Sequence, residues 1–332
     1  MQVIINKIAT VLCVKDGVFL LKNSEGDQSF APPKVKSILL NPGTSLTYEA
    51  IVLAVESGID ILFTERSGFP VARIWTNRFG SIATIRKQQV AFSQSEQATQ
   101  WVKQILIRKI ENQGLILSMI DGYQTSRSPI IRDAIAKLEV YRVRLSETAQ
   151  LSLQDAAGTF RGLEGKSGAV YFGVIGGLLP DKYRFGKRSQ HPAADMFNAM
   201  LNYAYGMLYG KIETALIKAG VDPFLGVFHR DEYNRPVLTY DWIEQYRIWA
   251  DYVVIKLCME HVIFIEFFEI KPDGAFWLAA DGKRILIQSL NDYLEEVVVI
   301  KGISRSRLHH IDWDITQFAG MLKTFGAKKN EM

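Results

Sequence analysis

The chain has few of the residues that build covalently linked or metal-clamped scaffolds. It contains two cysteines among 332 residues, Cys13 and Cys258, and each lies in an apolar run. Two such distant thiols provide neither a disulfide framework nor the paired spacing of a zinc site. We therefore expect both to be reduced and buried, as is common for cysteines of cytosolic proteins.

Long apolar runs are also missing. No stretch approaches about 18 uncharged apolar residues, so a membrane-spanning helix is not expected. The segment Met1–Lys7 contains no basic stretch leading into a long apolar one, so we expect no signal peptide and no membrane association. A glycine-rich nucleotide loop of the P-loop type is absent as well, which is consistent with chemistry that needs no ATP.

Neither sign of charge dominates. Lys and Arg number 39 against 35 Asp and Glu, which gives a net charge of +4 and a pI near 8.8. This mild excess permits nucleic-acid binding without requiring it, because charge alone argues for DNA only above a pI of about 9. A hydrophobic content of 48% and a charged content of 22% indicate a globular protein, long enough for two domains or one large one.

The first part of the chain has β-type patterns. Asp16-Gly17 divides the apolar run 10–21, which is a strong signal for a two-residue hairpin. Further strands are predicted over 35–40, 59–64 and 71–75, with one helix over 46–57. We therefore predict a small β-rich domain over residues 1–80.

After residue 88 helical periodicity dominates. The predicted helices cover 96–113, 130–145, 193–219 and 241–256, and the apolar stripes 253–268 and 286–299 also have helical character. The predicted fold class is thus α+β. We expect the β-rich domain, a hinge over 81–92, and a larger all-α catalytic domain over 93–332.

Three side chains of this larger part are suited to holding a metal ion. They are Glu164, His229 and Glu244. Two carboxylates and an imidazole can hold a divalent cation and leave positions open for a phosphate, which is the equipment of enzymes that cut or join phosphodiesters. Asp241 lies three residues before Glu244, and we expect it to orient His229 or a bound water.

These residues stand in an ordered set of motifs. The set consists of Leu163-Glu164-Gly165 followed by Tyr171-Phe172, Asn198 with Leu201–Tyr205, Ala219–Gly226 leading to His229, and Asp241–Arg247. In this order they resemble the motifs of the Cas one family, the CRISPR-associated integrases of spacer acquisition. The resemblance covers nearly the whole chain.

The resemblance implies a metal-dependent DNA integrase of the prokaryotic cytoplasm. Glu164, His229 and Glu244 would be its catalytic residues and the ligands of Mg²⁺ or Mn²⁺. The 3′-hydroxyl ends of double-stranded prespacer DNA would be joined to CRISPR repeat and leader DNA by transesterification. The implied assembly is a homodimer formed through the β-rich domain, together with a small ferredoxin-like adaptation partner.

Two alternatives remain open at this point. The same metal site could serve an endonuclease that acts on branched or single-stranded DNA, because water and a 3′-hydroxyl are both possible nucleophiles. The chain could also be a DNA-binding structural subunit whose catalytic site is unused, which its mildly basic charge would allow.

The predicted DNA contacts are basic residues. They are Arg73, Arg78, Arg86 and Lys87 near the hinge, Arg184, Lys187 and Arg188 in a loop after Pro180, and Arg247 in the last motif. Each would contact phosphate and carry little sequence information. A second candidate metal pair is His310 and Asp314, which are four residues apart; we favour a polar helix face over a metal site there.

Overall fold

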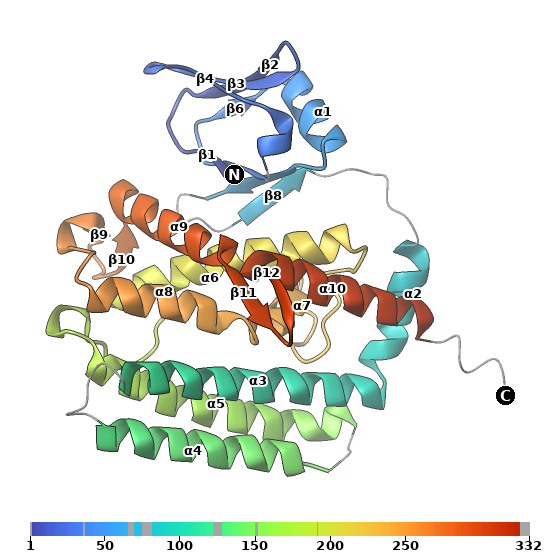
Figure 1. The fold of residues 1–332 in the computed structure, drawn as a ribbon, viewed down its shortest axis with the longest axis vertical. Coiled ribbons are helices and arrows are strands. Elements are labelled where there is room, and N and C mark those ends of the chain that lie inside the picture. The colour runs from blue at the N-terminus through green and yellow to red at the C-terminus, as the bar shows by residue number, and fades with distance from the viewer. Residues whose placement is uncertain are drawn as a thin grey trace. The chain divides into compact units, whose positions relative to one another are not determined.

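The computed structural model describes residues 2–35, 37–65, 70–74, 82–121, 128–149, 152–190 and 192–325. The chain forms two compact units, Met1–Gly80 and Ser81–Met332 (Figure 1). The first contains two four-stranded sheets and the second is mainly helical, so the predicted α+β class is confirmed.

The N-terminal unit is built on two sheets. One has the order β1 (Gln2–Ile5), β5 (Ser37–Leu40), β7 (Asp60–Thr64), β8 (Pro70–Ile74), and its first three strands are parallel. The other has the order β4 (Gly26–Phe30), β3 (Val18–Asn23), β2 (Val11–Lys15), β6 (Ser45–Leu46). Helix α1 (Tyr48–Glu56) packs against β2 and β7, and Leu12, Phe19, Ile38 and Ile61 form part of the buried core.

Local sequence explains two boundaries in this unit. Asp16 and Gly17 join β2 to β3 with φ values of 52° and 74°, which confirms the predicted hairpin. The side-chain oxygen of Thr47 accepts a hydrogen bond from the backbone N–H of Ala50 and so caps the N-terminus of α1.

The larger unit is a helical assembly. Its helices are α2 (Ile82–Ser93), α3 (Glu96–Asp121), α4 (Ser128–Glu147), α5 (Leu153–Leu178), α6 (Met196–Lys218), α7 (Val237–Ile243), α8 (Arg247–Met259), α9 (Ala280–Glu295) and α10 (Arg307–Thr324). Helices α3, α4 and α5 pack side by side (Figure 1). Helix α6 contacts α7, α8, α9 and α10, and most of its length is buried.

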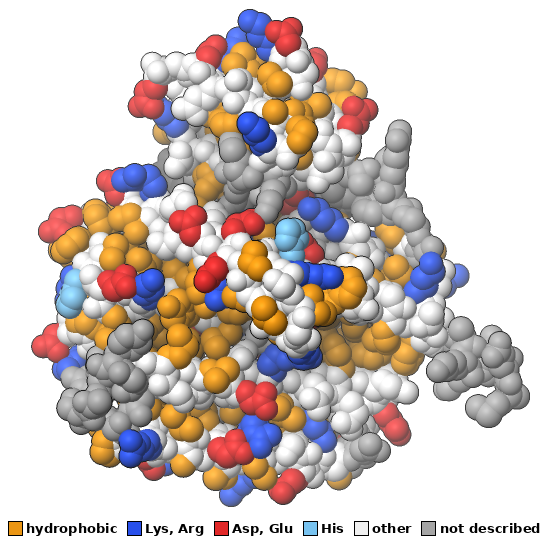
Figure 2. All heavy atoms as spheres, in the orientation of Figure 1, with side chains coloured by type: hydrophobic (Ala, Val, Ile, Leu, Met, Phe, Trp, Pro, Cys, Tyr) orange, Lys and Arg blue, Asp and Glu red, His pale blue; other side chains and the backbone are white. Residues whose placement is uncertain are grey.

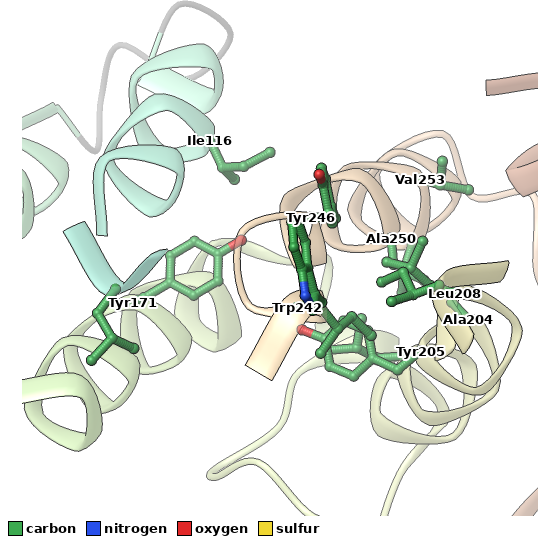
Figure 3. Packing of buried hydrophobic residues seen from close by; sticks show 14 of the residues in the cluster. Ile116, Tyr171, Ala204, Tyr205, Leu208, Trp242, Tyr246, Ala250 and Val253 are labelled. Carbon is green, nitrogen blue, oxygen red and sulfur yellow. The ribbon is translucent and has the colours of Figure 1, made fainter. Parts of the chain in front are cut away.

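Aromatic side chains from distant segments meet in this core. Figure 3 shows Tyr171 of α5, Tyr205 of α6 and Trp242 of α7 within one packed cluster. Tyr205 lies beside Ala204 and Leu208 of the same helix, all of them buried. The cluster fixes the positions of α5, α6 and α7, the elements that carry the motif residues.

The predicted hinge is wrong, because residues 82–93 form helix α2. Ile85, Gln89 and Phe92 recur at helical spacing and are buried. The Phe92 ring makes edge contacts with Trp101, at 6.2 Å between centroids, and with Phe318, at 5.4 Å. The side chain of Gln89 donates to the carbonyl of Asp222 and accepts that residue's N–H. Helix α2 is therefore an integral part of the larger unit.

The larger unit also contains two small hairpins, which corrects the expectation that it is all-α. Strands β9 (Phe268–Ile270) and β10 (Phe276–Leu278) pair, as do β11 (Val297–Ile300) and β12 (Ile303–Ser306). The predicted helical stripes 253–268 and 286–299 are accordingly shorter, with α8 ending at Met259 and α9 at Glu295. Val297–Ile300 is β-branched throughout, a composition that favours a strand.

No helix within the described part of the chain combines the length and apolar character needed to cross a bilayer.

Candidate active site

A cavity of about 300 Å³ lies in the larger unit, where α3, α5 and α6 meet the segment from α7 to α8. Glu164, His229 and Glu244 all line it. The lining also includes Lys109, Asn112, Gln113, Gly168, Phe172, Arg188, Gln190, Tyr205, Arg247, Ile248 and Asp251. The three residues singled out from the sequence therefore line one partly open pocket, although 80 positions separate the first from the last.

Asp241 fixes the loop that carries His229. Its carboxylate is buried, and it accepts the backbone N–H groups of Val227 at 2.7 Å, Phe228 at 3.0 Å and His229 at 2.9 Å. Oδ1 of the same carboxylate lies 2.6 Å from Nδ1 of the His229 ring. Because an ionised carboxylate only accepts, Nδ1 carries the proton, and in the neutral ring Nε2 keeps its lone pair for a ligand.

The electrostatic surroundings act on His229 in both directions. Burial lowers the pKa of its imidazole, whereas the hydrogen bond to Asp241 and the negative charges of Asp241, Glu244 and Glu164 raise it. The net effect is a pKa above the ordinary value of 6.5. The negative charges thus favour a positive charge at this position.

Glu244 lies at the end of α7 and is only 3% exposed. Nε of Arg247 donates to Oε1 and Oε2 of Glu244 at 2.9 and 3.0 Å, and Nη2 donates to Oε1 at 2.8 Å. Burial alone would raise the pKa of the Glu244 carboxyl, but Arg247 and Lys109 more than offset it and lower the pKa to about 2. Glu244 is therefore ionised throughout the physiological range.

Lys109 of α3 connects the two predicted carboxylate ligands. Its Nζ lies 2.5 Å from Oε1 of Glu164 and 2.5 Å from Oε2 of Glu244. Burial lowers the pKa of the Lys109 ammonium, but the charges of Glu244 and Glu164 raise it above its ordinary value. Lys109 is not among the residues predicted from the sequence, since a single lysine on an amphipathic helix has no local signal that distinguishes it from surface charge.

The donors of the site can be compared with those that a divalent ion needs. Within the described residues, no group of three or more His, Cys, Asp or Glu side chains is arranged to hold a metal as it stands. The Lys109 ammonium nevertheless marks a point where both carboxylates reach one cation. With the imidazole in the same cavity, these oxygen and nitrogen donors suit Mg²⁺ or Mn²⁺ chemically.

A family model described as CRISPR associated protein Cas1 matches residues 3–292. The chain belongs to the Cas1 family. A curated relative, CRISPR-associated endonuclease Cas1 1 of Archaeoglobus fulgidus, is 24% identical over 320 residues, which is 91% of this chain and 90% of the relative. CRISPR-associated endonuclease Cas1 3 of Thermus thermophilus is 39% identical over 110 residues, 33% of each chain.

Solved structures share the fold. A casposase bound to integration product has a TM-score of 0.81 at 19% identity, covering 98% of this Cas1 chain and 91% of the casposase. A Cas1 protein from Thermotoga maritima has a TM-score of 0.77 at 18% identity, covering 97% of each chain. A chain of a Cas6-RT-Cas1–Cas2 complex has a TM-score of 0.78 at 18% identity, with 98% of this chain and 35% of that chain covered.

Two of the predicted DNA-contact residues line the cavity. Arg188 donates to Oδ1 of Asn198 and Oδ1 of Asn202, both at 2.6 Å. Besides Glu244, Arg247 donates to the Tyr209 hydroxyl at 2.9 Å. The motif asparagines of α6 thus hold the Arg188 loop, and both guanidinium groups belong to the walls of the site.

The other basic candidates have different surroundings. The side chain of Arg73 is only 4% exposed, and its Nε lies 3.5 Å from Oδ1 of Asp60 in the N-terminal unit. Arg86, Lys87, Arg184 and Lys187 are exposed, with Arg184 paired to Asp181. Arg78 lies outside the described residues. On the face drawn in Figure 2, basic side chains are interspersed with acidic ones.

His310 and Asp314 face different partners. Nε2 of His310 lies 3.2 Å from the carbonyl oxygen of Val298, and Oδ2 of Asp314 accepts the Tyr246 hydroxyl at 2.7 Å. His310 is only 5% exposed, so the favoured interpretation of a polar helix face is wrong for this residue. Both side chains have structural partners.

A buried carboxyl that the sequence patterns do not mark, that of Asp251, also lines the cavity. Asp251 of α8 accepts the hydroxyls of Tyr171 at 3.1 Å and Tyr205 at 2.5 Å. Burial raises the pKa of Asp251 to about 6, although the two hydroxyls and Arg247 act in the opposite direction. Asp251 therefore joins α5, α6 and α8 beside the cavity.

Proposed function

We propose that this protein joins the 3′-hydroxyl ends of short double-stranded DNA to the repeats of a CRISPR array by transesterification. The observation that carries the proposal is that Glu164, His229 and Glu244 line one cavity, with the His229 ring oriented by Asp241. Membership of the Cas1 family supports it, as does a fold shared with a casposase bound to integration product.

In this proposal Glu164, His229 and Glu244 hold Mg²⁺ or Mn²⁺. When bound, the ion would polarise the target phosphate and stabilise the leaving oxygen. Asp241 keeps the proton on Nδ1 of His229, so that Nε2 is available as a ligand. Arg188 and Arg247 place positive charge in the walls, where it can offset phosphate oxygens, and no ATP is needed because one phosphodiester replaces another.

A joining assay tests the proposal. Labelled duplex DNA with free 3′-hydroxyl ends is mixed with a target that contains repeat and leader, and Mn²⁺ or Mg²⁺ is added. We expect joined product from the wild type, and none from His229→Ala, with EDTA, or from DNA with 3′-deoxy ends. DNA binding should persist in His229→Ala. Undiminished joining by that variant would show that His229 is not needed for the reaction.

A second candidate is hydrolysis of DNA at the same site. The curated relatives described above are named endonucleases, which favours it. Analysis of products separates the two reactions, since joining gives strands longer than the labelled substrate and hydrolysis gives shorter ones. A protein that binds DNA but gives neither product with either ion would be a structural subunit.

The assembly is also proposed. We expect a homodimer formed through the β-rich unit, together with a small ferredoxin-like partner, and one structural neighbour is a Cas6-RT-Cas1–Cas2 complex. Light scattering of the purified protein, alone and with such a partner, measures both associations. A monomer that stays monomeric when mixed with the partner would contradict this assembly.

A further inference from the structure

The distinctive feature of the cavity is the side chain of Lys109. Its ammonium lies 2.5 Å from a carboxylate oxygen of Glu164 on α5 and 2.5 Å from one of Glu244 at the end of α7. Two carboxylates that converge in a confined space repel each other unless a cation lies between them. The Lys109 ammonium supplies that cation.

A divalent ion held by the same two carboxylates would compete with this ammonium. Like charges a few ångströms apart in a partly buried site repel strongly, so both cannot occupy the same position. The lysine side chain has a flexible four-carbon stem and a compact head, which allow it to move without its helix. Glu244 would remain paired with Arg247 after Lys109 left, because three hydrogen bonds join those two side chains.

An alternative partner for Lys109 lies one helical turn away. Gln113 is four residues further along α3, lines the same cavity and is 6% exposed. Within the described part of the chain, its buried Oε1 has no hydrogen-bond partner. Side chains at i and i+4 are neighbours on a helix, and an unpaired buried carbonyl is costly, so this oxygen is a suitable acceptor for a displaced ammonium.

Helix α3 itself is held in place beside Glu244. Arg108 donates to Oε1 of Gln245 at 2.6 Å, and Nδ2 of Asn112 donates to the Gln245 backbone carbonyl at 2.9 Å. These bonds fix the backbone on both sides of Lys109 next to the residue that follows Glu244. A change in the partner of Lys109 therefore has to come from its side chain.

We propose that Lys109 is an internal cation that competes with the divalent ion. It bridges Glu164 and Glu244 in the metal-free protein and moves to Oε1 of Gln113 when the ion binds. The inference rests on the proposed metal site. Its consequence is that Lys109 weakens metal binding while keeping the carboxylates in place, and that Gln113 favours binding by accepting the displaced ammonium.

Calorimetric titration of the full-length protein with Mn²⁺ alone, without DNA, tests this inference. We expect Lys109→Met to bind Mn²⁺ about tenfold more tightly than the wild type and Gln113→Leu to bind it a few-fold more weakly. In the Lys109→Met background, Gln113→Leu should have no further effect, because no ammonium remains to be accepted. This non-additivity is the signature of the proposed movement.

Lys103→Met is the matched control. Lys103 lies on the same helix and is buried, but its Nζ donates to the carbonyls of Ser146 and Thr148, away from the cavity. Its loss should leave Mn²⁺ affinity unchanged. Thermal unfolding with EDTA and with Mn²⁺ provides a second measurement, in which Lys109→Met should be less stable than the wild type in EDTA and gain more from Mn²⁺.

The outcomes separate the two proposals. A wild type that binds no Mn²⁺ would overturn the metal site and this inference together. A wild type that binds Mn²⁺, with Lys109→Met equal to it or weaker, would overturn the competition and leave the metal site standing. Should Lys109→Met fail to fold, Gln113→Leu decides the matter in the presence of the lysine, and an unchanged affinity there would overturn the movement.

Discussion

Nδ1 of His229 lies 2.6 Å from Oδ1 of Asp241, and the same carboxylate accepts three consecutive backbone N–H groups from Val227 to His229. One buried side chain thus sets the path of the loop and the orientation of the ring that the loop presents. The carboxylate is suited to this because it has enough lone pairs to accept all four donors at once.

Replacing Asp241 by Asn should therefore affect both stability and the site. The amide has one acceptor oxygen in place of two and adds donors that face the loop's own N–H groups. We expect the free energy of unfolding to fall by about 2 kcal/mol. We also expect a roughly 10- to 100-fold loss of Mn²⁺ affinity, which is typical when a residue that orients a metal ligand is replaced. Urea unfolding and Mn²⁺ titration measure these.

The control for that variant is Asp231→Asn. Asp231 accepts the N–H of Gly226 at 2.9 Å in the same loop, but it is exposed and makes no bond to His229. If both variants lowered Mn²⁺ affinity equally, the orienting role of Asp241 would be refuted.

Metal binding should depend on pH through His229. In the proposed metal site the neutral ring would be the ligand, and the surrounding carboxylates hold its pKa above 6.5, so Mn²⁺ affinity should increase as pH rises through that pKa. In the metal-free protein the sign is opposite: protonated His229 stabilises the fold below the unfolded pKa of 6.5, and this is lost as pH rises through the folded pKa. Titrations from about pH 5.5 to 8.5 test both, and flat profiles would contradict the assignment.

Glu244→Gln should be more destabilising than Glu164→Gln in EDTA. It leaves the partly buried Arg247 and Lys109 without their shared carboxylate, at a cost of about 3 kcal/mol, whereas Glu164 is 24% exposed. Since its pKa is lowered to about 2, Glu244 contributes stability above about pH 4.5 that is lost as pH falls toward 2. Urea unfolding of both variants near pH 7 and pH 3 measures this, and equal losses would show that burial does not decide the cost.

Helix α2 provides a test of the domain boundary. Phe92 is 1% exposed and contacts Trp101, Phe318 and Phe325, so Phe92→Ala should cost about 3–5 kcal/mol of unfolding free energy. Val90, which is exposed on the same helix, is the control, and Val90→Ala should cost little. A negligible effect of Phe92→Ala would restore residues 81–92 as a linker.

Substitutions of the exposed residues Arg86 and Lys87 should affect DNA binding, whereas substitution of the buried Arg73 should affect stability. If Arg86 and Lys87 neutralise phosphates, Arg86→Gln and Lys87→Gln should each weaken DNA binding. Each should also make the slope of log affinity against log salt concentration shallower by about one. Arg73→Gln should lower the stability of the N-terminal unit, because its side chain is buried beside Asp60. Fluorescence anisotropy over a range of salt concentrations separates these, and Lys137→Gln on the exposed face of α4 serves as a neutral control.

Local sequence was sufficient wherever the physics is local. The positive φ values of Asp16 and Gly17 follow from the two residues alone, and α6 follows from apolar residues at helical spacing within it. The motif set around Glu164, His229 and Glu244 was visible because its members lie in short, ordered segments.

Tertiary packing decided the rest. Lys109 lies 55 positions before Glu164, and nothing within its own helix distinguishes it from Lys103 or from a surface lysine. Likewise, burial raises the pKa of Asp251 to about 6 against the opposing effect of its hydrogen bonds from Tyr171 and Tyr205, which belong to other helices. The short-range patterns of the chain determine which helices and turns form and which metal-capable side chains are available. Which charged groups surround each carboxylate depends instead on core packing, because packing brings together helices that are far apart in the sequence, and local patterns do not encode those distances.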